Sequence, residues 1–500
     1  MPPVQIPRQP PRVRGAPSAE GALDVDCTSR IHPNRVPVTD AASAAEFPSP
    51  TSPIAGEAGR VSLSELLSAL SRSLDMTEGQ PPGHTLRTCF IGMRLADDLG
   101  LEEEARTALY YALLLKDAGC SSNAARMASL FGSDDQAVKY RMKFPDWHHG
   151  FGLAVATARN VAMHGRIRER VRHFLQIART ENMTRDLIQV RCDRGADIVR
   201  SLGFPEASAE TVRALDEHWC GKGYPQGLEG EAIPLLARIA NLAQTLEIFH
   251  GVAGPVGALR MAKARRGTWF DPALVDRVLA WRGDASFWDA LASADIEARV
   301  ISAEPGAEAR LADDAELDAV CEAFAQIVDA KSPFTYRHST NVAAFAAGIA
   351  GEAGAPSAEL RRLRRAGLLH DVGKLGVSSR ILDKPGALTA GERAEIERHP
   401  VFSWEILSRV AAFRDFAWTS VLHHERIDGT GYPWRLDGEH LDTAARTLAV
   451  ADIHEALTAD RPYRAGMEPA RSFAIVSSMQ GICGEAVGGL EAFLQRRGEL

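Results

Sequence analysis

The apolar residues of this chain recur with helical spacing from about Val61 onward. The segment SLSELLSALSRSL, which follows Val61, places its leucines three and four positions apart, as on one face of an α-helix. Val342, Phe345, Ala346 and Ile349 form a second stripe with this spacing. Runs that alternate apolar and polar residues, as strands do, are almost absent. The pattern predicts an all-α fold.

The start of the chain differs from the rest. Eleven of the 27 prolines lie within residues 1–53, mixed with serine, alanine and glycine. Such a segment cannot bury a core, so we expect residues 1–58 to form a disordered, proline-rich tail. The remaining chain is too long for a single core of ordinary size, which predicts two domains.

An internal repeat divides the chain after the tail. Three positions match at a constant offset of 254: His84, Lys116 and Asp117 in the first copy, and His338, His370 and Asp371 in the second. Further on, GKGYPQGLEGE matches GTGYPWRLDGE at an offset of 208, so the first copy carries an insertion of 46 residues. We therefore predict a first domain over 59–290, with a helical insertion at about 120–190, and a second domain over 300–500.

The net charge and the spacing of the cysteines limit the partners and the cellular compartment that we expect. The net charge is −8, and no block of lysine and arginine offsets it, which argues against a nucleic-acid polymer as partner. The seven cysteines are scattered without a CxxC pair, as expected for reduced thiols. Neither a signal peptide nor an apolar run of 18 residues is found. We expect a cytoplasmic protein that does not enter a membrane.

Metal-binding residue types gather in the second copy. Five histidines and two aspartates stand there at intervals: His338, His370, Asp371, His399, His423, His424 and Asp452. Imidazole and carboxylate together suit Fe, Mn or Zn, and a shared carboxylate can hold two cations at the spacing that phosphoester hydrolysis uses. A single histidine in a helical protein is usually structural, so the order and the context of these seven residues must decide.

Four segments supply that context: HDVGK (370–374), HP (399–400), HHERIDGTGYP (423–433) and ADIHEALTADRPYR (451–464). In this order they closely resemble the HD-GYP family, a branch of the HD-domain metal-dependent phosphohydrolases. The resemblance covers roughly 320–470 in full and 60–250 in weakened form, which implies two tandem HD-type helical domains. Family members hydrolyse cyclic di-GMP, often through the linear dinucleotide to GMP, and some act on related cyclic dinucleotides. We therefore expect a cyclic-dinucleotide phosphodiesterase, with cyclic di-GMP as its substrate.

The resemblance also implies roles for single residues. The seven histidines and aspartates match the family's metal ligands, with Asp371 in the bridging, catalytic position. Lys374 matches the lysine that supports the phosphoryl group, and Arg461 and Arg464 match positions that contact substrate phosphate. Three residues match the loop beside the site, a surface implicated in binding a protein partner: Gly431, Tyr432 and Pro433.

Two divalent metal ions are expected, Fe or Mn first, with other first-row metals left open. Some family members bind a third metal through a glutamate four residues before the first histidine, but Phe334 stands at that position here. Two cations would lower the pKa of a shared water. The bridging hydroxide would then attack phosphorus while the cations and Lys374 stabilise the growing charge.

The first copy has lost most of this set. Its residues at the seven equivalent positions are His84, Lys116, Asp117, Arg191, Leu215, Asp216 and Gln244. Lysine and arginine bring positive charge to metal positions, so we predict no metal there and a regulatory or dimerising role, with a homodimer left open. Two alternatives stay open for the whole chain: a phosphohydrolase for another nucleotide, and a catalytically weak signalling or binding module.

Overall fold

The computed structural model describes residues 61–148, 150–163, 165–179, 182–306, 310–460 and 464–500. The predicted tail, residues 1–58, lies outside them. Regular structure in these residues is helical, with isolated bridges and no strands. The prediction of an all-α fold is confirmed.

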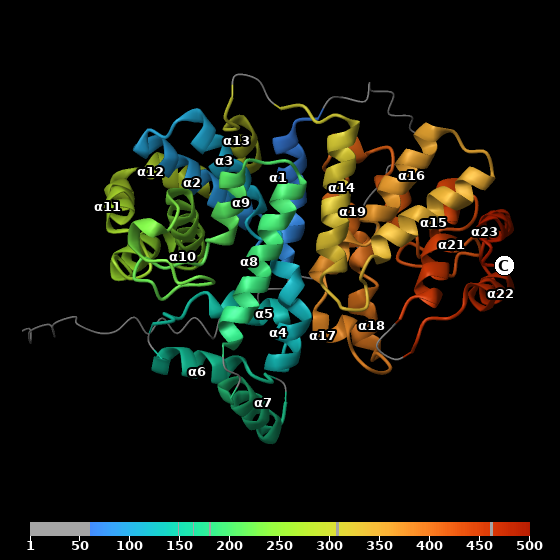
Figure 1. Ribbon diagram of the computed structural model, residues 1–500, viewed down its shortest axis with the longest axis horizontal. Coiled ribbons are helices and arrows are strands. Elements are labelled where there is room, and N and C mark those ends of the chain that lie inside the picture. The colour runs from blue at the N-terminus through green and yellow to red at the C-terminus, as the bar shows by residue number, and fades with distance from the viewer. Residues whose placement is uncertain (1–60, 149, 164, 180–181, 307–309, 461–463) are drawn as a thin grey trace, which may run out of the picture. The chain divides into compact units, whose positions relative to one another are not determined.

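In the first copy, α4 to α7 lie in the stretch predicted as an insertion (Figure 1). The helices of this copy are α1 Leu63–Thr77, α2 His84–Leu99, α3 Glu103–Leu115, η1 Cys120–Asn123, α4 Ala124–Phe131, α5 Asp135–Met142, α6 Gly150–Asn160, α7 Ile167–Arg179, α8 Met183–Ser201, α9 Glu206–Arg213, η2 Gly230–Ala232, α10 Leu235–Ala264, α11 Pro272–Ala280, η3 Trp281–Gly283, α12 Ala285–Leu291 and α13 Ile296–Ser302.

The helices of the second copy follow the same order without the insertion. They are α14 Asp314–Asp329, α15 His338–Glu352, α16 Ser357–Leu369, η4 Val372–Gly376, α17 Ser379–Leu382, α18 Ala390–Ile396, α19 His399–Leu407, η5 Ala411–Phe413, α20 Ala417–Val421, α21 Thr443–Thr458, α22 Pro469–Ser478 and α23 Gly484–Arg497.

The first helix of each copy begins at a side-chain cap and carries in its last turn an aspartate that fixes the next helix. Ser62 caps α1, and Asp313 caps α14 in a capping box with Glu316, which satisfies N–H groups that have no partner within the helix. Asp75 Oδ1 accepts hydrogen bonds from Thr85 N and Oγ1, at 2.9 and 2.7 Å. Asp329 holds Ser339 in the same way in the second copy. These aspartates therefore fix the starts of α2 and α15.

The two copies share one hydrophobic core. A continuous cluster of buried side chains includes Leu70 of α1, Phe324 of α14 and Leu375 of η4. The first helix of each copy crosses to the other copy, because α1 packs against η4 and α19, while α14 packs against η1 and α8. Figure 1 shows α1, α8, α14 and α19 next to one another. The segment that carries the HDVGK motif is therefore packed between helices of both copies.

Within the described part of the chain, no helix is at once long enough and apolar enough to cross a bilayer.

Candidate metal centre

The seven predicted ligands lie close together in the second copy, although they come from separate elements. His338 is the first residue of α15, and the His370-Asp371 pair joins α16 to η4. His399 begins α19 and Asp452 lies within α21. His423 and His424 follow α20 directly. All seven are buried except His424, whose side chain is 23% exposed.

Asp371 lies at the middle of this group and faces two sets of histidines. Its Oδ2 is 3.3 Å from His338 Nε2 and 3.2 Å from His370 Nε2. Its Oδ1 is 3.3 Å from His399 Nε2 and 3.6 Å from His423 Nε2. Each carboxylate oxygen therefore points toward a different pair of imidazole nitrogens, as a carboxylate between two cations would.

The remaining ligands complete two adjacent groups of donors. Their ligand atoms lie within 4.8 Å of one another in each of these groups: His338, His370 and Asp452; and His399, His423 and His424. Three donors plus one oxygen of Asp371 make four for each cation, which is a sufficient set for a first-row metal.

Backbone carbonyls set the tautomers of three histidines. The Nδ1 atoms of His370, His399 and His423 donate to carbonyl oxygens three residues earlier, at 2.7, 2.8 and 2.7 Å. A carbonyl can only accept, and a neutral imidazole has a single N–H. The lone pair therefore lies on Nε2, which faces the centre of the site and is able to bind a metal.

Several buried acceptors at the centre lack a partner, as a cation site requires. Among the described residues, His338 Nε2, His370 Nε2 and Asp371 Oδ1 are buried without a hydrogen bond. Buried polar atoms normally have partners, because desolvation without compensation is unfavourable. Divalent cations would satisfy these atoms, so the residues present fit a metal centre.

The charge of the site points the same way. Burial disfavours a charged imidazole, yet the neighbouring carboxylates of Asp371 and Glu455 raise the pKa of His338 to about 10. Burial also opposes the charged form of Asp371, but the electrostatic influence of His370 and Lys374 holds its pKa well below the usual range. The site therefore favours a positive charge next to an ionised Asp371.

Lys374 lies at the edge of the centre. Its Nζ donates to Asp371 Oδ2, and its side chain is 20% exposed. The ammonium group can therefore reach both the Asp371 carboxylate and a ligand that enters from solvent.

Of the two arginines predicted to contact substrate phosphate, the structure describes one. Arg461 lies outside the described residues. Arg464 donates to the carbonyl oxygens of Leu457 and Ala456 at 2.8 and 2.5 Å, so it holds the end of α21, which stops at Thr458. The contact of Arg464 with substrate phosphate stays a prediction.

The Gly-Tyr-Pro loop borders the metal centre. The ring of Tyr432 stacks on His424, with centroids 4.6 Å apart. A side chain at Gly431 would clash with the Glu425 backbone, since its Cβ would lie 2.5 Å from Glu425 Cα. The Glu425 carboxylate accepts from the backbone N–H groups of Trp434, Arg435 and Leu436, at 2.7, 3.2 and 3.0 Å. Hydrogen bonds to Glu425 therefore fix the conformation of the loop. Binding of a protein partner at this loop stays a prediction.

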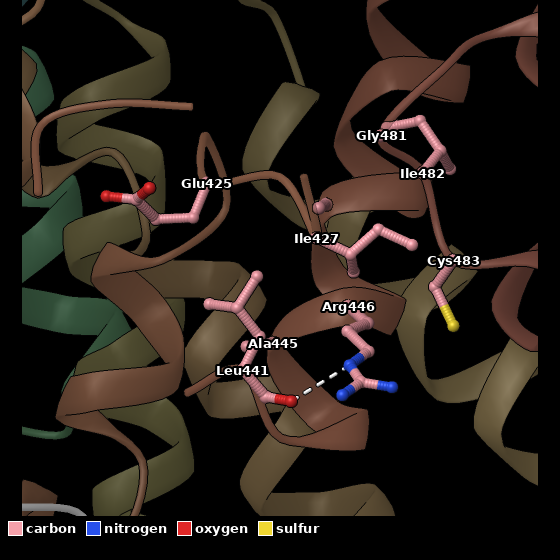
Figure 2. Close-up of a pocket in the computed structure, with 9 residues that line it drawn as sticks. Glu425, Ile427, Leu441, Ala445, Arg446, Gly481, Ile482 and Cys483 are labelled. Carbon is pink, nitrogen blue, oxygen red and sulfur yellow. Dashed lines mark hydrogen bonds between the residues drawn. The ribbon is translucent and has the colours of Figure 1, made fainter. Parts of the chain in front are cut away.

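Two cavities near this region are too small for a dinucleotide. Glu425, Ile427 and Arg446 line one of about 10 Å³, in which Arg446 Nε donates to Leu441 O (Figure 2). This volume holds about one water. A second cavity, of about 250 Å³, borders Glu455, and it too is smaller than ordinary ligand pockets. The cluster around Asp371 is therefore the candidate site.

In the first copy, cationic side chains occupy the equivalent positions. Lys116 Nζ donates to Asp117 and lies 3.0 Å from His84 Nε2. Arg191 forms an ion pair with Asp216. The ammonium and guanidinium groups therefore neutralise the carboxylates that would otherwise bind metal.

A further group of donors in the first copy is neutralised as well. Glu78, Asp117 and Cys120 are close enough to hold a cation. However, Lys143 and Lys139 of the insertion lie 2.7 and 3.5 Å from Glu78. Burial would raise the pKa of Glu78, but these two lysines hold it well below the usual range. The insertion thus supplies the positive charge that a metal would bring.

One residue of the site was missed in the sequence. Glu455 accepts from His338 Nδ1 and so directs Nε2 of that ring toward the centre. Glu247 makes the same contact with His84 in the first copy. The repeat contained the signal, because Glu247 and Glu455 match at the offset of 208. A glutamate retained in both copies at this position could have been found by that alignment.

Comparison with protein families gives two matches in one chain. The model of the HD domain family matches residues 147–274 and 322–484. Together these segments cover more than half of the 500 residues. The second match contains all seven predicted ligands.

Individual relatives match over different lengths. The 3'3'-cGAMP-specific phosphodiesterase 3 of Vibrio cholerae is 42% identical over 420 residues, 83% of this chain and 90% of that protein. A cyclic di-GMP phosphodiesterase of Pseudomonas aeruginosa is 39% identical over 149 residues, 30% of this chain and 36% of that protein. A crystal structure of a cyclic GMP-AMP specific phosphodiesterase of V. cholerae is similar with a TM-score of 0.61 and 39% identity. It covers 87% of this chain and 98% of that one.

Proposed function

Because this chain belongs to the HD-domain family, in its HD-GYP branch, we propose that it is a phosphodiesterase that hydrolyses a cyclic dinucleotide, with 3'3'-cGAMP as the preferred substrate. The observation that supports this best is the arrangement around Asp371, whose two oxygens face separate sets of histidine nitrogens. Such an arrangement suits a pair of cations and a phosphodiester between them.

The choice of substrate rests on the extent of the likeness. The relative that is similar over both copies is named for 3'3'-cGAMP. Relatives named for cyclic di-GMP, such as the one from P. aeruginosa, match about 150 residues. Cyclic di-GMP, the substrate expected from the sequence, is therefore the second candidate.

Two divalent first-row metals, Fe or Mn first, are part of the proposal. One would bind His338, His370 and Asp452, the other would bind His399, His423 and His424, and Asp371 would serve both. When bound, these cations supply the Lewis acidity that activates water and offsets phosphate charge.

The chain's own groups prepare the reaction around that pair. The three carbonyls that accept from Nδ1 keep the histidine lone pairs directed inward. Glu455 orients His338, and Asp371 stays ionised. The Lys374 ammonium group lies at the exposed edge of the site. There it can donate a hydrogen bond to a phosphate oxygen and stabilise the negative charge that develops on this oxygen in the transition state.

The proposal also assigns the two copies different tasks. We assign hydrolysis to the second copy (300–500) and a non-catalytic role to the first (59–290), whose lysine and arginine replace the metals. A protein partner at the Gly-Tyr-Pro loop and a homodimer stay predictions.

A substrate panel tests the proposal. Purified full-length protein, loaded separately with Fe(II) and Mn(II), is given 3'3'-cGAMP, cyclic di-GMP, cyclic di-AMP and a set of mononucleotides. The products are separated by chromatography, and binding of each cyclic dinucleotide is measured by calorimetry. We expect the highest kcat/KM with 3'3'-cGAMP. A higher value with cyclic di-GMP would reverse the order of the two candidates. Tight binding of a cyclic dinucleotide without hydrolysis of any of the three would favour the alternative of a catalytically weak signalling or binding module. Hydrolysis of mononucleotides alone would favour the alternative of a phosphohydrolase for another nucleotide.

A further inference from the structure

One backbone carbonyl in the second copy receives two buried hydrogen bonds, and one of them comes from the first copy. Leu375 O accepts from Lys331 Nζ at 2.7 Å and from Gln136 Nε2 at 2.8 Å. Leu375 directly follows Lys374 in η4, four residues after Asp371. Lys331 belongs to the second copy, but Gln136 belongs to α5 of the first. The first copy therefore reaches the segment that carries both proposed catalytic residues.

A neighbouring aspartate holds the other end of the same segment. Asp135 Oδ1 accepts from Ser379 N at 2.8 Å and from Ser378 Oγ at 3.2 Å. Both Asp135 and Gln136 are buried. Two successive residues of α5 thus hold the stretch from Leu375 to Ser379 at both ends.

The connection between α1 and α2 packs closely against α5, the helix that contacts this stretch. A Cβ at Gly79 would lie 2.6 Å from Gln136 O, and Gly79 has a φ of +63°, so glycine alone allows this approach without strain. On the other side, Met76 of α1 lies next to Gly376 of η4. The backbone of Gln136 is therefore closely packed against this connection, and its side chain is buried.

The backbone of η4 carries this constraint to Lys374. Lys374 N donates to Asp371 O at 2.8 Å, and Val377 N donates to Lys374 O at 3.0 Å. A shift of the Leu375 peptide would disturb the turn between these bonds. The direction of the Lys374 side chain therefore depends on what holds Leu375 O.

We propose that Gln136 is a positioning residue for hydrolysis in the second copy, because it fixes the Leu375 carbonyl and through it the ammonium group of Lys374. This inference rests on the proposed function. It gives the first copy a part in the reaction of the second: a helix of the copy without ligands supports the active segment of the copy that has them. Asp135 and Gln136 lie between Asp117 and Arg191, the stretch within which the first copy carries its 46 additional residues.

The test replaces Gln136 by methionine, which keeps the size of the side chain but removes its donors. Lys331 still binds Leu375 O, so the effect should be partial. We expect kcat to fall about fivefold, the effect of one hydrogen bond of about 1 kcal/mol. KM should stay within about twofold and metal content should be unchanged. Hydrogen exchange should become faster in peptides that cover residues 371–379.

Asn241→Leu is the matched control. Asn241 Nδ2 donates to Glu217 O at 2.8 Å, so it is also a buried amide on a backbone carbonyl, but both groups lie in the first copy. This variant should lower Tm to a similar extent, with kcat and the exchange of residues 371–379 unchanged. Equal losses of kcat in both variants, or an unchanged kcat in Gln136→Met, would overturn the inference.

The exchange measurement separates this inference from the proposed function. If the wild-type protein hydrolysed no cyclic dinucleotide, the proposed function would fail. If exchange of residues 371–379 became faster in Gln136→Met but not in Asn241→Leu, the result would still support the proposal that Gln136 holds this segment in place. Unchanged exchange in Gln136→Met would contradict it.

Discussion

Asp371 and Asp117 occupy matching positions in the two copies, yet they meet opposite surroundings. Asp371 lies among four imidazole nitrogens at 3.2 to 3.6 Å, with Lys374 at its edge. Asp117 receives the ammonium group of Lys116, and Arg191 pairs with Asp216 nearby. Among the described residues, the second copy leaves His338 Nε2, His370 Nε2 and Asp371 Oδ1 without a hydrogen bond, whereas in the first copy Lys116 and Arg191 supply positive charge at the equivalent positions.

The contacts that hold the backbone are the same in both copies. His84 pairs with Glu247 as His338 pairs with Glu455. Glu217 accepts from three successive N–H groups of its Gly-Tyr-Pro loop, as Glu425 does from the loop of the second copy. Bonds that position helices and loops are needed for folding whether or not a metal binds, because buried polar groups require partners. The residues predicted to bind the cations are needed only for metal binding, and five of the seven differ in the first copy.

The largest expected difference between the copies is at these aspartates. Asp371→Asn removes the charge that the two proposed cations would share, so we expect kcat on the preferred cyclic dinucleotide to fall about 10³-fold or more, with loss of metal. Asp117→Asn should leave kcat within about twofold. Steady-state kinetics, metal analysis and Tm are measured on both full-length variants. A near wild-type rate in Asp371→Asn, with activity lost in Asp117→Asn, would place the active site in the first copy.

A smaller effect is expected at Lys374. Lys374→Met removes one charged donor at the edge of the site and should lower kcat about 10²-fold, as the loss of a single donor to developing charge does elsewhere. Metal content should stay at the wild-type value, since lysine is not among the ligands. Cys120→Ser, at the matching position of the first copy, should not change kcat. A fall in metal content equal to the fall in rate would show that Lys374 supports the ligands instead of the substrate.

The two glutamates that hold the first histidine of each copy give a finer comparison. Glu455→Gln weakens the acceptor for His338 Nδ1 and should lower metal affinity about 10- to 100-fold, the usual effect of removing a group behind a ligand. Titration of metal-depleted protein, followed by calorimetry, measures this. An unchanged affinity would mean that packing alone orients His338.

Glu247→Gln should instead affect stability alone. Burial would raise the pKa of Glu247, but the charges of His84 and Arg87 lower it to about 2. A lowered carboxylate pKa stabilises the fold above the unfolded pKa, and this stability is lost as pH falls from about 4.5 toward about 2. The free energy of unfolding should thus be lower than wild type at neutral pH, with a difference that shrinks on acidification. A loss of bound metal in this variant would contradict a metal-free first copy.

The sequence by itself determined the helical class, the repeat, and the seven residues that the structure brings together around Asp371. These features follow from spacing and motif order, which are properties of the linear chain. Tertiary structure decided which oxygen of Asp371 faces which histidines, and that Glu455 lies behind His338. It also placed Arg464 on the end of α21 and brought Gln136 to Leu375, a residue 239 positions away. Contacts of this kind depend on how distant helices pack and on which backbone carbonyls remain to be satisfied, and no local pattern of residues records either.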